Sequence, residues 1–327
     1  MIRFLILPFL FLFLTGCATT GSTETKIPAW ITDPLKNTPE KLYGSGAGSS
    51  PDAAVVQALE SITSQLYAAI KSSMNKNNHP IRLAGDETTR QEVLNFVKAY
   101  SKKFDFNTLH VEEAFHVDTE YIALISLDRK LLYTQQKMKL DTQISQIEST
   151  LSTVKTETSF EYFVQLYHAH KQHKSILAQM EILYAINNTF PPKRYQSFID
   201  QIDRKYYALK QSLHIRLVGD ANAIYFLTPI KNALNAEGMK VNNTQQKGDK
   251  VVTVLLSATS QHDEIQQYKT VKIRLDIDVK KSNKSLASAT HTLHGKSSDS
   301  YQKARVQAVG HLKNKIDSIG IFNVLGF

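Results

Sequence analysis

The middle of the chain carries the pattern that most constrains its fold. Residues 128–212 contain no glycine, and most of their apolar residues recur at spacings of three and four. That spacing places them along one side of a helix. The seams are Tyr133, Leu140, Ile144, Ile147, Leu151 and Val154 in a first helix, Phe163, Leu166, His170, His173, Leu177, Met180 and Tyr184 in a second, and Phe198, Ile202, Tyr206 and Leu209 in a third. We call each such row of residues along one side of a helix a seam. Short breaks between the three seams predict an antiparallel helical hairpin plus a third helix.

Residues 27–127, before this segment, predict an α+β unit. Ser50 and Pro51 open an amphipathic helix, because serine is a good N-cap and proline suits the first helical position. A second helix is expected over about 87–103. Alternating apolar residues over 109–117 and 121–127 then predict an antiparallel hairpin.

Three glycines, Gly44, Gly46 and Gly48, precede the first helix of this unit. A dinucleotide-binding loop needs G-x-G-x-x-G after a buried strand. Here the spacing is G-x-G-x-G, and the preceding segment does not read as a buried strand. The pattern instead predicts a short strand whose glycines allow the following helix to approach closely.

Residues 213–327 predict a second α+β unit with the order βαββββα and a mainly antiparallel sheet. The clearest strand spans 271–279, where apolar and charged residues alternate. The final helix, about 299–319, is expected to bury one stripe of residues, Ala304, Ala308, Leu312, Ile316 and Ile319. The expected class is therefore α+β, with two domains of small, mainly antiparallel sheets joined by a three-helix segment.

The first sixteen residues have the pattern of a secretory signal. Arg3 precedes an unbroken apolar run of 11 residues, which is too short to span ~30 Å of hydrocarbon as a helix. The run ends in Leu-Thr-Gly-Cys, which resembles the lipobox of bacterial lipoproteins. The resemblance implies cleavage before Cys17, acylation of Cys17 and, with Ala18 next, delivery to the outer membrane. Two or three acyl chains anchor a protein stably, and residues 18–26 are small and polar like a flexible tether.

Composition narrows the classes of partner and cofactor. Cys17 is the only cysteine, which excludes an intramolecular disulfide, a Cys-ligated zinc site and an iron–sulfur cluster. The formal charge is +9, yet no block of five like charges occurs. A secreted location argues against nucleic acid as a partner and leaves lipopolysaccharide, anionic lipid and peptidoglycan as negative surfaces. Alternatively, the positive charge binds no specific partner and only keeps the protein soluble.

The order Pro-x-Trp, Tyr-Gly-x-Gly and an alanine-rich helix over 27–127 resembles the LPP-twenty family of bacterial lipoproteins. The matching positions are Pro28, Trp30, Tyr43, Gly44, Gly46, Ala53, Ala54 and Ala58. The resemblance implies a small α+β domain of the kind found in outer-membrane lipoproteins and flagellar ring accessory proteins. It brings no catalytic residue, because the family has none in common.

The densest histidine cluster is His168, His170 and His173. His170 and His173 share a helix face, so a metal pair is geometrically possible. Lys171 and Lys174 add positive charge, however, and no acidic residue lies within the cluster. Since both histidines occupy seam positions, where a polar residue can fix register, a structural role is favoured. A metal site or a pH-responsive role is the alternative, and we expect no bound metal and no cofactor.

Two further pairs of residues could be taken for catalytic or metal sites, but their patterns argue against it. Asp276 and Asp278 share a strand face with Lys and Arg, as in a solvated charge ladder. His291 and His294 are an odd number of residues apart on a strand and must point to opposite faces. No G-x-S-x-G, H-E-x-x-H or P-loop motif occurs, so no catalytic residue is assigned and no enzyme is expected.

These observations favour a non-enzymatic outer-membrane lipoprotein that faces the periplasm. We expect a membrane attachment through lipid and envelope proteins as partners. The role would be a scaffold, assembly or accessory factor of a flagellar or secretion structure, with the helical layer as either partner surface or brace. The alternatives are an activator of a peptidoglycan synthase and, from another class, an envelope hydrolase.

Overall fold

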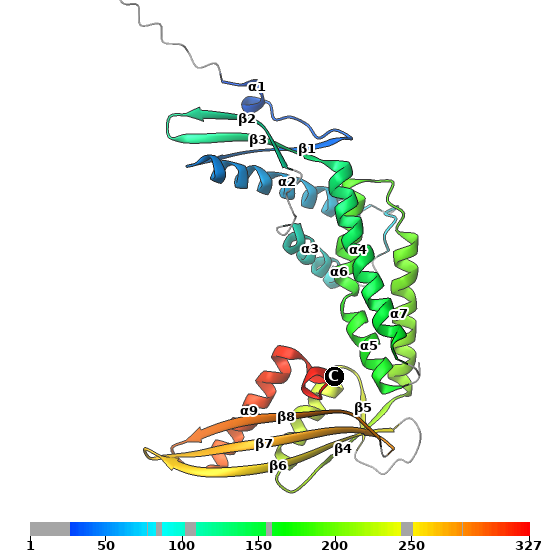
Figure 1. Cartoon of the computed structure of the whole chain (residues 1–327), viewed down its shortest axis with the longest axis vertical. Coiled ribbons are helices and arrows are strands. Elements are labelled where there is room, and N and C mark those ends of the chain that lie inside the picture. Colours follow the sequence, from blue (N-terminus) through cyan, green and yellow to red (C-terminus); the bar gives the residue numbers. More distant parts are fainter. Residues whose placement is uncertain are drawn as a thin grey trace, which may run out of the picture.

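The computed structural model describes residues 27–76, 78–82, 87–101, 109–154, 159–242, 251–282 and 284–327. Over these residues the chain forms three consecutive parts, a first sheet-and-helix unit, a helical layer and a second sheet-and-helix unit (Figure 1). The α+β class is confirmed. The signal segment, Cys17 and the tether lie outside the described residues. No helix in the described ranges is long and apolar enough to cross a bilayer.

The first unit is a three-stranded antiparallel sheet with helix α2 on one face. Its sheet has the strand order β1-β3-β2, so the predicted hairpin is confirmed as β2 and β3. Ser50 caps α2 by accepting a hydrogen bond from the backbone nitrogen of Ala53. The elements are α1 (Ala29–Thr32), β1 (Lys41–Gly48), α2 (Pro51–Met74), α3 (Glu87–Ser101), β2 (Leu109–Val117) and β3 (Glu120–Asp128).

The glycines of β1 lie directly beneath α2. A methyl group added at Gly46 would overlap the backbone nitrogen of Ala58, and one added at Gly44 would overlap the carbonyl oxygen of Ala58. At Gly48 the same atom would lie 2.6 Å from the backbone nitrogen of Ala54. The close approach of helix to strand that the sequence predicts is therefore confirmed.

The helical layer contains α4 (Arg129–Ser152), α5 (Phe160–Lys171), α6 (His173–Ile186) and α7 (Lys193–Ser212). The predicted second helix is wrong in one respect, because it is two helices that meet at Gln172. The backbone N–H of Gln172 bonds to the carbonyl of Ala169, three residues back, which ends α5. Helix α4 packs on α5 and α6, and α7 packs on α5.

The second unit is a five-stranded sheet with α8 and α9 packed on it. Its order is β5-β4-β6-β7-β8, and β4 runs parallel to both β5 and β6. The sheet is thus mixed: the long β6-β7 and β7-β8 pairings are antiparallel, as predicted, and the shorter β4 pairings are parallel. Helix α8 returns the chain to the same end of the sheet, which makes β5 parallel to β4. The elements are β4 (His214–Gly219), α8 (Ile224–Ala236), β5 (Lys240–Asn242), β6 (Val251–Ile265), β7 (Tyr268–Lys281), β8 (Lys284–Ser297), α9 (Tyr301–Ile319) and α10 (Ile321–Val324).

Helix α9 buries the predicted stripe except at its end. Ala304, Ala308, Leu312 and Ile316 are buried, whereas Ile319 is 44% exposed, so its predicted burial is wrong. Ile319 is the last residue of α9, and the chain turns at Gly320, which has a φ of +84°. The turn aims α10 back toward the core, and Ile321 and Phe322 are buried instead.

Both units pack on the helical layer. Phe322 of α10 lies against the rings of Tyr167 and Phe163 of α5, with centroids 4.6 and 5.7 Å apart. At the other end, α3 packs on α6, and the buried pair His79 and Glu181 joins the chain before α3 to α6 at 2.8 Å. One hydrophobic core therefore continues from Leu42 to Leu325.

Candidate functional site

A cleft of about 870 Å³ lies where α3 faces α5, α6 and α7. Helix α3 contributes Glu92 and Phe96 to its wall. The opposite wall carries the two histidines of the predicted seam together with Asp203 of α7. We take this cleft as the candidate functional site, because it holds titratable groups from three separate segments.

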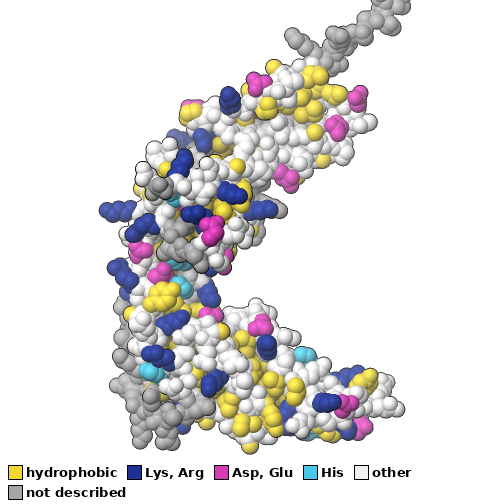
Figure 2. Space-filling model, turned by 180° about the vertical axis from the view of Figure 1, so that it is seen from behind, with side chains coloured by type: hydrophobic (Ala, Val, Ile, Leu, Met, Phe, Trp, Pro, Cys, Tyr) yellow, Lys and Arg dark blue, Asp and Glu magenta, His cyan; other side chains and the backbone are white. Residues whose placement is uncertain are grey.

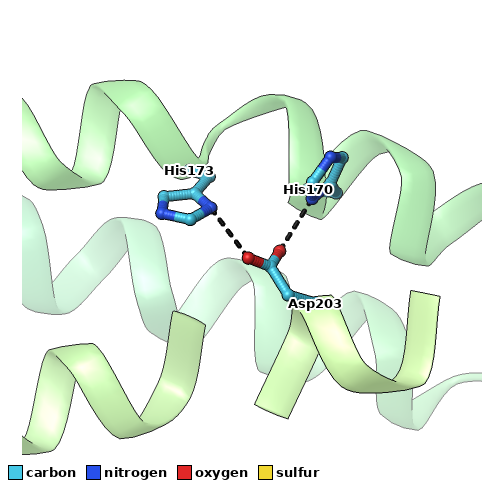
Figure 3. A group of neighbouring side chains, drawn as sticks. All are labelled: His170, His173 and Asp203. Atoms are coloured by element: carbon cyan, nitrogen blue, oxygen red, sulfur yellow. Dashed lines mark hydrogen bonds and ion pairs between the residues drawn. The ribbon is translucent and has the colours of Figure 1, made fainter. Parts of the chain in front are cut away.

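His170, His173 and Asp203 form one cluster in the cleft (Figure 3). His170 stands near the end of α5 and His173 begins α6, so the break at Gln172 sets their separation. Nδ1 of His170 lies 2.7 Å from Oδ1 of Asp203, and Nδ1 of His173 lies 3.0 Å from Oδ2. Each oxygen of the Asp203 carboxylate thus contacts one imidazole.

The cluster is held in place by its neighbours and is partly screened from water. The ring of His170 stacks on Tyr206 at 4.4 Å between centroids, with 15° between the planes. The side chain of Asp203 keeps 24% of its surface exposed. Burial alone would raise the pKa of Asp203, but the hydrogen bonds from His170 and His173 outweigh it and lower the pKa to about 2. Asp203 is therefore ionised at neutral pH.

The two lysines beside the histidines are paired with acids from other elements. Lys171 lies 3.4 Å from Glu237, which follows α8, and Lys174 forms an ion pair with Glu92 of α3. Their charges are partly neutralised by these partners. The positive charge of Lys171 and Lys174, which argued from the sequence against a metal ion beside the histidines, is therefore a weaker objection.

The structure brings two of the three clustered histidines together and excludes the third. His168 lies on another side of α5, at a separate hollow beside Gln143 and Ile147 of α4, and burial lowers its pKa. Sequence reasoning missed Asp203, because it is contributed by another helix. The sequence feature that could have indicated Asp203 is its position next to Ile202, a seam residue of the third predicted helix.

The motif residues of 27–127 lie in the first unit, where they serve packing. Trp30 is buried, and its indole nitrogen donates to Oε2 of Glu113 in β2 at 2.5 Å, which fixes α1 to the sheet. Pro28 precedes α1, and Tyr43 belongs to β1, where its backbone nitrogen donates to Asn37. Cys17, the predicted lipidation site, lies outside the described residues.

The remaining candidates behave as the sequence predicts. Asp276 pairs with Arg274 at 3.1 Å and Asp278 with Lys280 at 2.7 Å, which is a solvated charge ladder. His291 is buried, with Nε2 2.8 Å from the carbonyl oxygen of Val324, and His294 is exposed on the opposite face. On the face that Figure 2 shows, Lys and Arg side chains are scattered with Asp and Glu among them along the helical layer.

Comparison with known proteins does not assign the chain to a family. No protein-family model matches the chain, and no curated protein matches it. The LPP-twenty resemblance of residues 27–127 therefore stays a prediction.

Three solved structures match part of the chain. The secreted protein HP1454 from Helicobacter pylori shares 15% identity, with a TM-score of 0.48 over 87% of this chain and 98% of that chain. A minor lipoprotein from Acinetobacter baumannii shares 12% identity, with a TM-score of 0.28 over 35% of this chain and 95% of that chain. Rare lipoprotein B from Shewanella oneidensis shares 8% identity, with a TM-score of 0.21 over 34% of this chain and 87% of that chain. These likenesses assign no role to any residue.

Proposed function

We propose that this chain is a non-enzymatic lipoprotein of the bacterial outer membrane. Acyl chains on Cys17 would anchor it, and its folded part would face the periplasm. There it would act as a scaffold or assembly factor for an envelope structure of the flagellar or secretion type. The lipobox supports the location, and the packing of the three parts supports the role.

The observation that carries the scaffold role is the packing of both α+β units on one helical layer. Aromatic rings join the second unit to α5, and α3 together with the His79 and Glu181 pair joins the first unit to α6. A continuous core of this kind resists the domain motion that small polar interfaces permit. Two binding surfaces on such a body would keep a fixed separation, which is what a scaffold needs.

Surface composition supports a role in binding other proteins. Met138 on α4 and Val306 on α9 are 63% and 65% exposed, and Ile224 and Tyr225 at the start of α8 are exposed as well. Hydrophobic side chains gather over parts of both units in Figure 2. Exposed apolar groups that cluster on a surface mark places where partners bind.

The location is tested by fractionating cells that produce the full chain. We expect the protein in outer membranes, and we expect Cys17→Ala to release it from membranes. The matched variant is Ala18→Asp, which keeps the cysteine and should move the protein to the inner membrane if the sorting rule applies. Persistence of Cys17→Ala in the outer membrane would overturn the anchoring argument.

The role is tested by placing a photo-crosslinking residue at Met138 or at Val306 in living cells. We expect adducts to one and the same envelope assembly from both positions, because a scaffold holds its partners in a fixed relation. Adducts to a peptidoglycan synthase, with faster glycan synthesis in a purified assay, would instead favour the activator alternative. The absence of adducts from both positions would contradict the scaffold role.

A further inference from the structure

We propose that His170, His173 and Asp203 form a binding site for a divalent transition metal ion, with Zn²⁺ as the best-fitting member of the class. The proposal goes beyond the scaffold role and does not depend on it. The two imidazoles approach the carboxylate of Asp203, one at each oxygen (Figure 3), and one ligand atom from each of the three residues lies within 4.8 Å of the others. That donor set, with one position left open, is a recurrent zinc arrangement in proteins.

The three donor atoms lie close enough together to reach one ion. Zinc bonds to nitrogen and oxygen are about 2.0–2.2 Å long, which places neighbouring ligand atoms about 3.3 Å apart. The Nδ1 atoms of His170 and His173 lie 2.7 and 3.0 Å from the two oxygens of Asp203, and all donor atoms lie within 4.8 Å of one another. Binding of the ion would lengthen the two nitrogen–oxygen separations toward about 3.3 Å.

The three ligands are supported by the surrounding structure. His170 is stacked on Tyr206, so its ring has a defined orientation. His173 and Asp203 come from different helices, and each is about four-fifths buried. Support of this kind limits the reorganisation that binding requires. All three side chains line the cleft, from which water or a side chain of a partner protein could fill an open coordination position.

The charges around the cluster permit a cation. Asp203 supplies the acidic ligand of the set, and both of its oxygens face the two imidazoles. Lys171 and Lys174, which follow the two histidines directly in the sequence, are paired with Glu237 and Glu92. The imidazole donors select Zn²⁺, Ni²⁺ and Cu²⁺ over Mg²⁺ and Ca²⁺, which prefer sites made of oxygen ligands alone.

The alternative reading is a metal-free clamp that ties α5 and α6 to α7. Two neutral imidazoles can each donate an Nδ1–H to one oxygen of Asp203, and this arrangement satisfies the carboxylate without an ion. The clamp and the metal site differ in one measurable respect. Only the metal site binds Zn²⁺ with a dependence on all three side chains.

The test is a titration of the full chain, purified in detergent without a polyhistidine tag, with Zn²⁺ in competition with a chromophoric chelator. Cys17→Ser serves as the background, because a free thiolate is itself a zinc ligand. We expect one equivalent of Zn²⁺ to bind and an excess of Mg²⁺ not to displace it. His173→Gln and Asp203→Asn should each weaken binding by about tenfold or more.

Two matched variants serve as controls. His294→Gln removes an exposed histidine from β8, and Asp200→Asn removes an exposed carboxylate one turn before Asp203 on α7. Both should bind Zn²⁺ as tightly as the background protein. Absence of binding in the background protein, or equal binding in all four variants, would overturn the proposal and leave the metal-free clamp.

A measurement on the background protein alone keeps the proposal testable if a variant does not fold. X-ray absorption at the zinc edge should show two imidazole ligands and additional oxygen ligands. A first shell with no imidazole, or with three or more, would contradict the assignment of this site.

Discussion

At the scale of single residues, the β1 glycines are required by the distance between strand and helix. Gly46→Ala places a methyl group onto the backbone nitrogen of Ala58, and backbone cannot move aside as a side chain can. We expect the free energy of unfolding to fall by about 1–3 kcal/mol, the usual cost of overpacking. Urea unfolding followed by circular dichroism measures the change.

Gly310 provides the matched control. It lies inside α9, and a methyl group added there meets no atom within 4 Å. Gly310→Ala should therefore stabilise the protein by about 0.5–1 kcal/mol, because alanine loses less backbone entropy in a helix. If Gly46→Ala were neutral, α2 would not lie on β1 as closely as described.

Asp141 is a second residue whose effect on stability can be predicted, and this effect depends on pH. Its carboxylate lies 2.7 Å from Nζ of Lys137 and accepts from the hydroxyl of Tyr195 at 2.9 Å. Burial opposes ionisation, but these two hydrogen bonds lower the pKa of Asp141 below its ordinary value. A lowered pKa stabilises the folded state above the ordinary carboxyl pKa of about 3.9, and this stabilisation is lost as the pH falls through the lower, folded-state pKa.

Asp141→Asn should therefore lower the free energy of unfolding by about 1 kcal/mol at pH 7 and by progressively less below about pH 4. Unfolding by urea at pH 7, 5, 4 and 3 gives the profile. Asp200→Asn is the control, because Asp200 and its partner Arg82 are both exposed and such pairs contribute little. A difference between wild type and Asp141→Asn that stayed constant down to pH 3 would contradict the assigned pKa shift.

At the scale of elements, local patterns predicted most of the helices and strands, and long-range pairing was not predictable. The spacing of three and four continues across Gln172, and no glycine or proline stands there. The sequence therefore contains no sign of the break between α5 and α6. Alternation identified β7 but carries no information on which strands run parallel, so the β4 pairings were missed. Asp203 was missed for the same reason, since a residue's neighbours on other helices depend on packing.

Helix α10 is short, but its aromatic residue connects the second unit to the helical layer. Phe322 is 1% exposed and contacts the rings of Phe163 and Tyr167. Phe322→Ala should lower the free energy of unfolding by about 3–5 kcal/mol, the usual cost of removing a buried phenylalanine. Thermal and urea unfolding measure the loss.

Phe322→Leu is the matched variant, because leucine keeps much of the apolar volume without the ring. We expect a cost clearly below that of Phe322→Ala. Equal stability of Phe322→Ala and wild type would mean that α10 does not hold the second unit against α5.

At the scale of the whole molecule, the sequence predicted three parts but not how they are joined. The chain boundaries near 127 and 212 follow from changes in periodicity. The joints depend on residues far apart in the chain, such as Phe322 with Phe163 and His79 with Glu181. These contacts leave no local pattern. They turn three parts of a chain into one body with a continuous core.

The fixed arrangement of the two units is the central claim, and one distance measurement tests it most directly. Because Cys17 is the only native cysteine, a Cys17→Ser background allows spin labels to be placed at Val56 on α2 and Val306 on α9, both exposed. Pulsed electron paramagnetic resonance then reports the distribution of distances between the units. We expect a single narrow distribution that broadens in Phe322→Ala. A broad or multiple distribution in the background protein would contradict a rigid scaffold.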